Sequence, residues 1–192
     1  MLNLRESARF LLPPPLRQQW HLLPLRGVLN SYPKSGRTWV RLMLSRAILR
    51  HYGHEDARSL KLMKLRGIEP RAPRLAARHG ADGLIQWKVP EQVTHRAEVS
   101  PFWPTRVILL ARDPRDVLVS RYFHRAKRSR DFRGSLNEYL DVEEGGLETI
   151  CRFLRVWRQG SEGRPGRVLF VRYEDLHADG ERELRRMLDF IG

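Results

Sequence analysis

Four short apolar runs alternate along the chain with longer segments in which apolar residues recur at helical spacing. The runs are bounded by polar or turn-forming residues and predict strands at residues 27–33, 84–89, 106–112 and 167–173. Two of them contain the continuously apolar stretches VILLA and VLFV. A continuous apolar run is typical of a parallel strand that is covered on both faces.

The segments with apolar residues at i, i+3 and i+4 predict helices. They cover residues 38–53, 113–128, 147–160 and 180–192. Gly53 is a stop signal, while Asp113 and Pro114 suit the N-cap and first position of a helix. Strands that alternate with helices predict an α/β domain with a parallel sheet flanked by helices. Residues 53–82 are rich in Arg and broken by prolines, and we expect an insertion there that covers the sheet.

The length of 192 residues and the 41% share of hydrophobic residues suit one globular domain. We expect residues 1–26, which contain the sequence PPP, to form an N-terminal arm and residues 27–192 to form the domain. The arm is a poor signal peptide, and no 18-residue apolar stretch predicts a transmembrane segment. The single cysteine, Cys151, excludes an internal disulfide framework and a cysteine-rich metal site, so we expect a cytoplasmic protein without a metal.

The chain is strongly basic, with a formal net charge of +14 and a pI near 11.0. Of its 36 basic residues, 31 are Arg, whose planar guanidinium group suits phosphate, sulfate and carboxylate. These arginines are spread along the chain and do not form one stripe interleaved with aromatic residues. We therefore expect no specific nucleic-acid partner.

The polar turn SYPKSGRTW, at residues 31–39, joins the first predicted strand to the first predicted helix. The unpaired N–H groups and the dipole of a helix N-terminus attract negative charge. Gly36 lets the backbone approach an oxyanion closely. Lys34 and Arg37 add positive charge. Ser35 and Thr38 add hydroxyl donors, so the turn predicts an anion-binding loop.

The order of these residues differs from the Walker A pattern G-x-x-x-x-G-K-[ST], because Lys34 precedes Gly36. This order argues against a P-loop kinase or NTPase. The turn instead resembles the phosphosulfate loop Y-P-K-S-G-T-T-W of the sulfotransferases that use 3′-phosphoadenosine 5′-phosphosulfate (PAPS), and it departs from that pattern at Arg37. The resemblance implies a P-loop NTPase-like sulfotransferase fold, with Lys34 near the leaving oxygen and Trp39 against the adenine. The alternative for Trp39 is ordinary core packing.

Two further stretches resemble the same family. VILLARDPRDVLVSRYF is similar to the segment that binds the 3′-phosphate, which implies that Arg112 and Ser120 contact this phosphate. Alternatively, Arg112 forms an ion pair with Asp116 and Ser120 is an ordinary helical serine. VLFVRYEDL resembles the strand before the last core helix, where Tyr173 would lie near the adenine or pack in the core.

The resemblance implies in-line transfer of a sulfuryl group from PAPS to a hydroxyl or amine of a small-molecule or carbohydrate acceptor, with PAP as the product. The base should be a His, whose pKa suits neutral pH. The family places this His in a Thr-His pair directly after the second strand, whereas here His95 follows Val89 by six residues. His95 is the candidate base, and His79, Glu91 or the lack of a working base are alternatives.

Members of the family usually continue beyond the point where this sequence stops, with elements of the acceptor pocket and a loop over the 3′-phosphate. The resemblance therefore implies a C-terminally short member. The alternative function is a shortened relative that binds PAP or PAPS without turnover. The sequence leaves the acceptor and the oligomeric state open, a homo-oligomer included.

Overall fold

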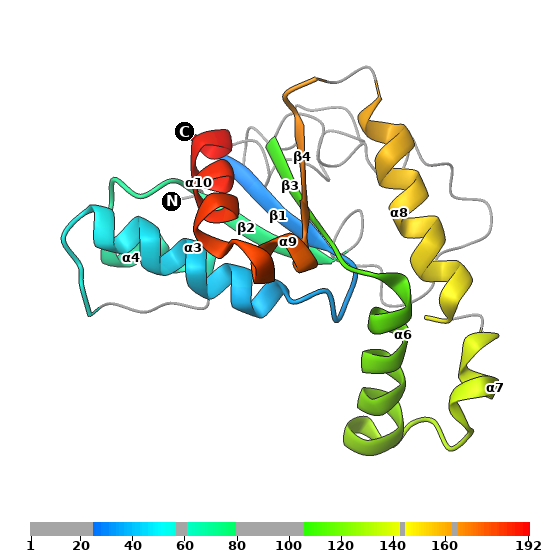
Figure 1. Cartoon of the computed structure of the whole chain (residues 1–192). Helices are drawn as coiled ribbons and strands as arrows, with labels where there is room; N and C mark the ends of the chain where they lie inside the picture. Colours follow the sequence, from blue (N-terminus) through cyan, green and yellow to red (C-terminus); the bar gives the residue numbers. More distant parts are fainter. Residues whose placement is uncertain (1–24, 57–60, 80–105, 143–144, 163–164) are drawn as a thin grey trace, which may run out of the picture.

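The computed structural model describes residues 25–56, 61–79, 106–142, 145–162 and 165–192 (Figure 1). Its sheet has four parallel strands in the order β2-β1-β3-β4. The strands are β1 (Gly27–Ser31), β2 (Leu75–His79), β3 (Arg106–Ala111) and β4 (Val168–Arg172). The expected α/β fold, with a parallel sheet flanked by helices, is confirmed.

Helices cover both faces of this sheet. One face is covered by α3 (Arg37–His51), the single 3-10 turn η1 (Leu62–Lys64), α4 (Leu65–Ile68), α9 (Tyr173–Ala178) and α10 (Gly180–Ile191). The other face is covered by α6 (Pro114–Phe123), α7 (Leu136–Leu140) and α8 (Leu147–Ser161), and the π-helix η3 (His124–Ser129) continues α6. Within the described ranges, no helix is both long and apolar enough to cross a membrane.

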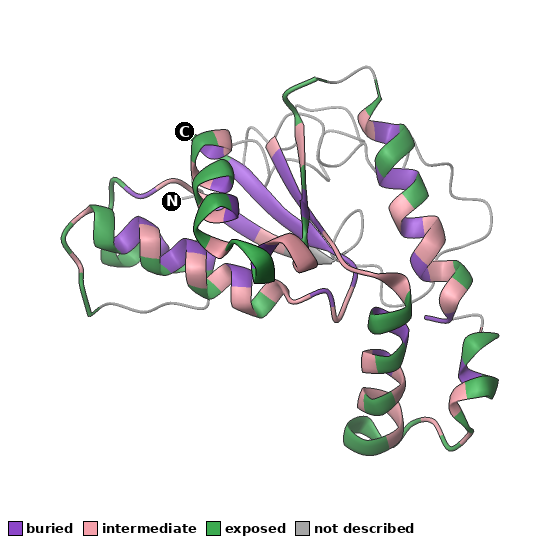
Figure 2. Ribbon diagram, viewed as in Figure 1, coloured by how far each residue is buried: buried purple, intermediate pink, exposed green. Residues whose placement is uncertain are grey.

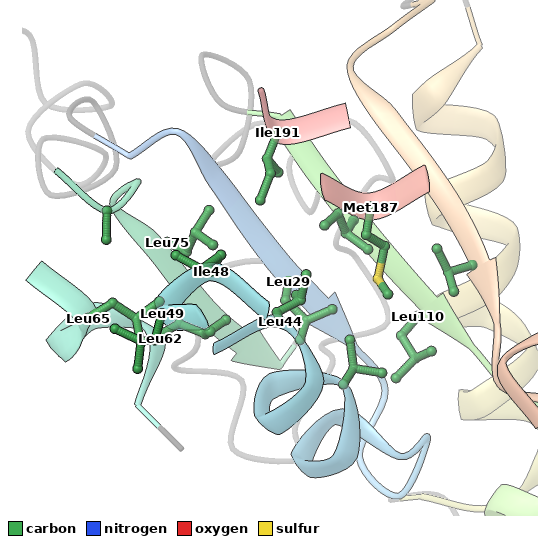
Figure 3. Close-up of a cluster of buried hydrophobic side chains, with 14 of the residues drawn as sticks. Leu29, Leu44, Ile48, Leu49, Leu62, Leu65, Leu75, Leu110, Met187 and Ile191 are labelled. Carbon is green, nitrogen blue, oxygen red and sulfur yellow. The ribbon is translucent and has the colours of Figure 1, made fainter. Parts of the chain in front are cut away.

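Strand residues alternate between two hydrophobic clusters, as a sheet covered on both faces requires. Val28 and Val107 belong to the cluster that includes Trp157 of α8. Their neighbours Leu29 and Ile108 point to the opposite cluster, under α3 and α10. Figure 2 shows the central strands buried between the helices, and Figure 3 shows the cluster under α3 and α10. The continuous apolar runs of the sequence therefore supply both cores.

The helix signals of the sequence are confirmed at several ends. Asp113 caps α6 by accepting a hydrogen bond from the Arg115 N–H at 2.9 Å, and Pro114 is the first helical residue. Gly53 follows α3 with a positive φ of 85°, the left-handed conformation that favours glycine. Pattern and capping residues together were sufficient to predict these helices.

One strand lies where the sequence predicted an insertion. β2 falls inside residues 53–82, and it pairs with β1 in parallel from Leu75 opposite Gly27 to His79 opposite Ser31. The prediction that this region only covers the sheet is therefore wrong. The sequence LAARH has weak intrinsic strand propensity and was not recognised as a strand, and it is the pairing with β1 that makes it one. The strand predicted at residues 84–89 lies outside the described residues.

The strand order creates a topological switch point between β1 and β3. The chain leaves β1 toward β2 on one side and leaves β3 toward β4 on the other. In open α/β sheets, the crevice at such a point, beyond the carboxyl ends of the strands, is where ligands bind. The polar turn after β1 and Arg112 after β3 both lie there.

Candidate functional site

The turn between β1 and α3 is held in an unusual backbone conformation. Lys34 and Gly36 have positive φ angles of 73° and 88°, so two left-handed residues flank Ser35. Among the described residues, no side chain caps the N-terminus of α3, and no acidic residue lies in its first turn. Such a concave run of backbone N–H groups at a helix N-terminus is suited to an anion.

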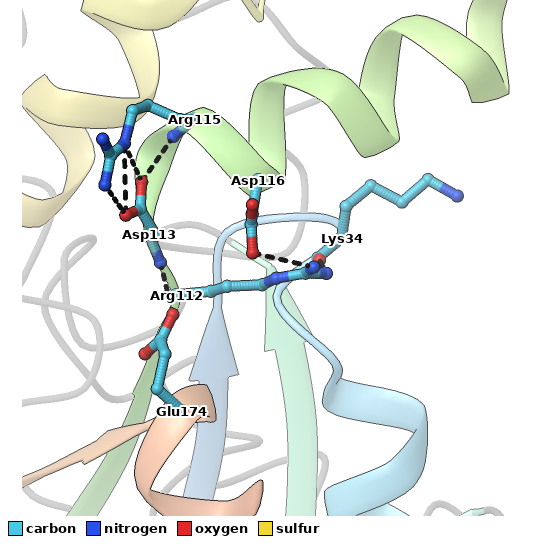
Figure 4. A network of polar contacts seen from close by, with 6 residues as sticks. All are labelled: Lys34, Arg112, Asp113, Arg115, Asp116 and Glu174. Carbon is cyan, nitrogen blue, oxygen red and sulfur yellow. Dashed lines mark hydrogen bonds and ion pairs between the residues drawn. The ribbon is translucent and has the colours of Figure 1, made fainter.

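Arg112 reaches across the carboxyl edge of the sheet to this turn (Figure 4). Its Nη1 donates to the Lys34 carbonyl oxygen at 3.2 Å, and its Nη2 lies 3.2 Å from the Asp116 carboxylate. The ion pair with Asp116 thus exists, but Asp116 is 60% exposed, and exposed pairs contribute only about 0–1 kcal/mol. The Nε of Arg112 is buried and has no hydrogen-bond partner in the described part of the chain.

A second set of contacts fixes the segment that follows Arg112. The backbone N–H of Asp113 donates to Glu174 Oε1 at 2.8 Å, which ties the start of α6 to α9. The Asp113 carboxylate accepts hydrogen bonds from Arg115, which hold the pKa of Asp113 down at about 2. Figure 4 shows this chain of contacts on one side of Arg112 and the Lys34 side chain directed away on the other. The network positions the Arg112 guanidinium and leaves the Lys34 ammonium outside it.

Three rings gather beside Arg112. The ring centroids of Trp39 and Tyr173 are 5.8 Å apart, and His177 lies 4.9 Å from Trp39 and 4.8 Å from Tyr173. The Arg112 guanidinium lies 4.5 Å from the centroid of the Tyr173 ring. Gly36 packs so close to this ring that a Cβ there would lie 2.4 Å from Tyr173 Cε2. The group is thus fixed against the anion-binding turn.

These parts line one cavity of about 920 Å³. Eight predicted residues contribute to its wall: Lys34, Gly36, Arg37, Thr38, Trp39, Arg112, Ser120 and Tyr173. Ser35 is buried within the turn, only 2% exposed, and does not line the cavity. His95 and Glu91 lie outside the described residues. His79 ends β2, the second strand of the chain, and its backbone pairs with Ser31, two residues before the lining residue Pro33.

The cavity also has a wall that the sequence analysis missed. It consists of residues at the end of α6, in η3 and just beyond it, together with one residue of α9: Arg121, His124, Arg125, Ser129, Asp131 and His177. A signal for His124 was present, because it follows Ser120 by four residues and therefore lies on the same face of a helix. The turn of η3 that brings Ser129 into the wall has no such signal.

The electrostatics of the cavity are strongly positive. Burial lowers the pKa of Lys34, and Arg128 and Arg121 lower it further. Burial and the neighbouring Arg41 lower the pKa of Arg37 to about 10, and the buried Arg37 Nε has no partner within the described ranges. Crowded, partly desolvated cations are stabilised by an anion, so the site is suited to a ligand with several negative charges. No group of His, Cys, Asp and Glu among the described residues could hold a metal ion.

A four-stranded parallel sheet flanked by helices, with a turn suited to an anion at its switch point, defines the chain as an α/β protein. Its sequence matches the Sulfotransferase domain over residues 26–192, so the chain belongs to that family. It is 26% identical to Cytosolic sulfotransferase 3 of Arabidopsis thaliana over 177 residues, which cover 86% of this chain and 52% of that protein. It is 27% identical to Sulfotransferase 1A1 of Bos taurus, over 86% of this chain and 58% of that protein.

Solved structures confirm the fold. Mouse sulfotransferase SULT7A1 complexed with PAP matches with a TM-score of 0.55 and 20% identity, over 86% of this chain and 58% of that one. Retinol dehydratase in complex with androsterone and inactive cofactor PAP matches with a TM-score of 0.57 and 20% identity, over 93% of this chain and 64% of that one. The chain thus spans little more than half the length of the curated relatives named above.

Proposed function

We propose that this chain transfers a sulfuryl group from PAPS to a hydroxyl or amine of a small-molecule or carbohydrate acceptor and releases PAP. The observation that carries the proposal is that the Lys34 turn, Arg112 with Ser120, and the rings of Trp39 and Tyr173 line one cavity at the switch point. Membership of the Sulfotransferase domain family and two structural neighbours that hold PAP support it. We place the protein in the cytoplasm, in keeping with its cytosolic relative.

The residues of the cavity fit a bisphosphorylated adenosine. Two arginine Nε groups, of Arg37 and Arg112, are buried without a hydrogen-bond partner among the described residues, and both side chains line the cavity. We assign the 3′-phosphate to Arg112 and Ser120, and the adenine to Trp39 and Tyr173. The 5′-side would lie on the turn at the start of α3, where Ser35 and Thr38 support the backbone donors.

Lys34 would act on the reaction itself. Its ammonium points away from the Arg112 network (Figure 4), so it can interact with the bridging oxygen on which charge grows as the sulfur–oxygen bond breaks. A cation placed where charge develops stabilises the transition state more than the bound substrate.

Thermal unfolding with PAP, AMP and ATP tests the nucleotide site. At about 100-fold excess over Kd, a bound ligand adds about 2.7 kcal/mol to the free energy of unfolding, which is readily seen as a higher Tm. At equal nucleotide concentrations, we expect PAP to raise the Tm more than ATP or AMP, because it should have the lowest Kd. Equal shifts from the three nucleotides would contradict a site for the 3′-phosphate.

One observation favours a second function, which is the binding of PAP or PAPS without turnover. The predicted base, His95, lies later in the sequence than the position that the family resemblance implies. Incubation with PAPS and a panel of hydroxyl and amine acceptors separates the two functions. Bound PAP with no transfer to any acceptor or to water would favour the second.

A further inference from the structure

The first two turns of α3 contain two arginines beyond those that the phosphates of the donor require. Arg37 is the first residue of α3 and lines the cavity, and Arg41 follows it one helical turn later. Residues four apart lie on the same side of an α-helix, so the two side chains are neighbours. The 3′-phosphate is assigned to Arg112 and Ser120 and the 5′-side to the turn before α3, which leaves this pair of arginines over.

The charges of this pair are half-buried and lack a counterion in the described part of the chain. The Nε atoms of Arg37 and Arg41 are buried without a hydrogen-bond partner, and no carboxylate of the described residues forms an ion pair with either side chain. Burial and the like charge of Arg41 lower the pKa of Arg37 to about 10. A bound anion would offset both the burial and the repulsion.

A second pair of arginines shows how the fold compensates such charges where their role is structural. Arg182 and Arg186 also lie four residues apart, on α10, and both donate to the carboxylate of the buried Glu183. The carboxylate between them removes the repulsion and makes the pair part of the core. Arg37 and Arg41 have the same spacing without a carboxylate among the described residues, and Arg37 faces the cavity instead.

The pair lies on the side of α3 away from the proposed adenine site. Trp39 contacts Tyr173, and Met43, one turn later, packs against Gly180, so this side of α3 faces α9 and α10. Arg37 precedes Trp39 by two residues, which is about 200° around an α-helix, and therefore lies on the other side. In-line transfer places the acceptor and the leaving oxygen on opposite sides of the sulfur, so the acceptor enters away from the adenine, where Arg37 forms part of the wall.

We propose that Arg37 and Arg41 bind an anionic group of the acceptor, so that the preferred acceptors are hydroxyl compounds that also carry a carboxylate or a sulfate. The proposal rests on the sulfotransferase function proposed above and narrows its acceptor. The planar guanidinium group suits both of these acid groups, which stay bound while a hydroxyl elsewhere on the acceptor receives the sulfuryl group. An ammonium group in the same place is repelled, which disfavours cationic amines.

Three phenols of similar size and different charge test this preference in the full chain. They are 3-(4-hydroxyphenyl)propionate, an anion; 2-(4-hydroxyphenyl)ethanol, which is neutral; and tyramine, a cation. For transfer of ³⁵S from labelled PAPS, we expect kcat/KM to be about tenfold higher for the anion than for the neutral phenol, and lowest for the cation. Added salt should reduce the difference. Glucuronate, glucose and glucosamine repeat the comparison for carbohydrates, so the two sources of an acid group are measured separately.

Substitutions of Arg41 test the pair without altering the turn that holds the donor. Arg41→Gln should lower the ratio of kcat/KM for the anion to that for the neutral phenol about tenfold, and Arg41→Lys, which keeps the charge, should restore part of it. The Tm of ligand-free Arg41→Gln should stay the same or rise, because a repulsion between like charges is removed. The control, Arg46→Gln, makes the same change of charge at an exposed position of α3 and should leave the ratio as it was.

The outcomes separate the anion subsite from the sulfotransferase function. Transfer without a preference for the anion, or a preference that Arg41→Gln retains, overturns the subsite and leaves the function standing. Weaker PAP binding by Arg41→Gln with an unchanged acceptor ratio assigns the pair to the donor and also overturns it. If the chain binds PAP but transfers to no acceptor, ligand-observed NMR of the three phenols with the PAP complex decides. Selective binding of the anion that Arg41→Gln abolishes supports the subsite while transfer fails, and equal binding of all three overturns both.

Discussion

Arg112→Ala should weaken PAP binding far more than AMP binding. The two ligands differ only in the 3′-phosphate, and the Arg112 guanidinium has a buried Nε without a partner in the described part of the chain. A hydrogen bond from a charged group contributes about 1.5–3 kcal/mol, and each 1.4 kcal/mol changes Kd by about tenfold. The affinity for PAP should therefore fall about 10- to 150-fold. For AMP, the loss is limited to the hydrogen bond that steadies the Lys34 carbonyl, which is about 1 kcal/mol or about fivefold.

Isothermal titration of both ligands to the same protein preparation measures this ratio. Asp116→Asn is the matched control, because it removes the ion pair at 3.2 Å but keeps the guanidinium. We expect the control to bind PAP at least as well as the unmodified chain, since it removes a negative charge close to the site. Equal losses for PAP and AMP in Arg112→Ala, or a loss in Asp116→Asn as large as in Arg112→Ala, would refute the assignment.

Three other changes test separate parts of the structure. Lys34→Ala should lower the transfer of ³⁵S from labelled PAPS to the acceptor panel about 10²–10³-fold and leave most of the PAP affinity in place. Retained turnover would contradict its role at the leaving oxygen. Gly36→Ala should lower both the Tm and the affinity for PAP, because its φ is 88° and the new Cβ would lie 2.4 Å from the Tyr173 ring. Its control, Gly53→Ala, has a φ of 85° but open space around the new Cβ, so it should lower the Tm alone. Hydrogen bonds from Arg71 lower the pKa of Glu69 from an ordinary 4.5 to about 2. These bonds therefore stabilise the folded protein above pH 4.5, and this stabilisation is lost as the pH falls from 4.5 toward 2. Acid melting curves should show this loss in the unmodified chain but not in Glu69→Gln.

The sequence predicted the parts of the fold whose local pattern and tertiary environment agree. β3 and β4 are continuous apolar runs, and α10 has an apolar stripe, so pattern alone placed them near their true bounds. β2 lacks such a pattern, and only its pairing with β1 makes it a strand. Glu183 interrupts the apolar face of α10 yet is 1% exposed, because Arg182 and Arg186 neutralise it there. A pattern of apolar positions does not predict a buried ion pair.

The same distinction applies to the candidate site. The residues proposed to bind the nucleotide lie in two short motifs, the turn after β1 and the segment that begins at Arg112 after β3. The switch point of the sheet brings these two motifs together. His124 was within reach of a helical-spacing argument from Ser120. Its contact with Ser129 was not, because an α-helix would turn residue i+5 to a different face and only the π-helical turn returns it. The sequence favoured His95, the histidine in a Thr-His pair, because the second strand was expected at residues 84–89; the structure instead has its second strand at β2, which ends at the alternative candidate His79.

Backbone strain in the turn between β1 and α3 links the two halves of the proposed donor site. Lys34 holds a left-handed conformation with φ of 73°, which costs a residue other than glycine about 1–2 kcal/mol. Arg112, 78 positions later, donates to the carbonyl oxygen of this same residue, and such a bond from a charged group offsets a cost of that size. Arg112 thus maintains the turn that directs the Lys34 ammonium and also lines the cavity itself. Because strained residues persist where the surrounding structure holds them, we expect the two motifs to act as one unit, in which a change at Arg112 also alters the geometry at Lys34.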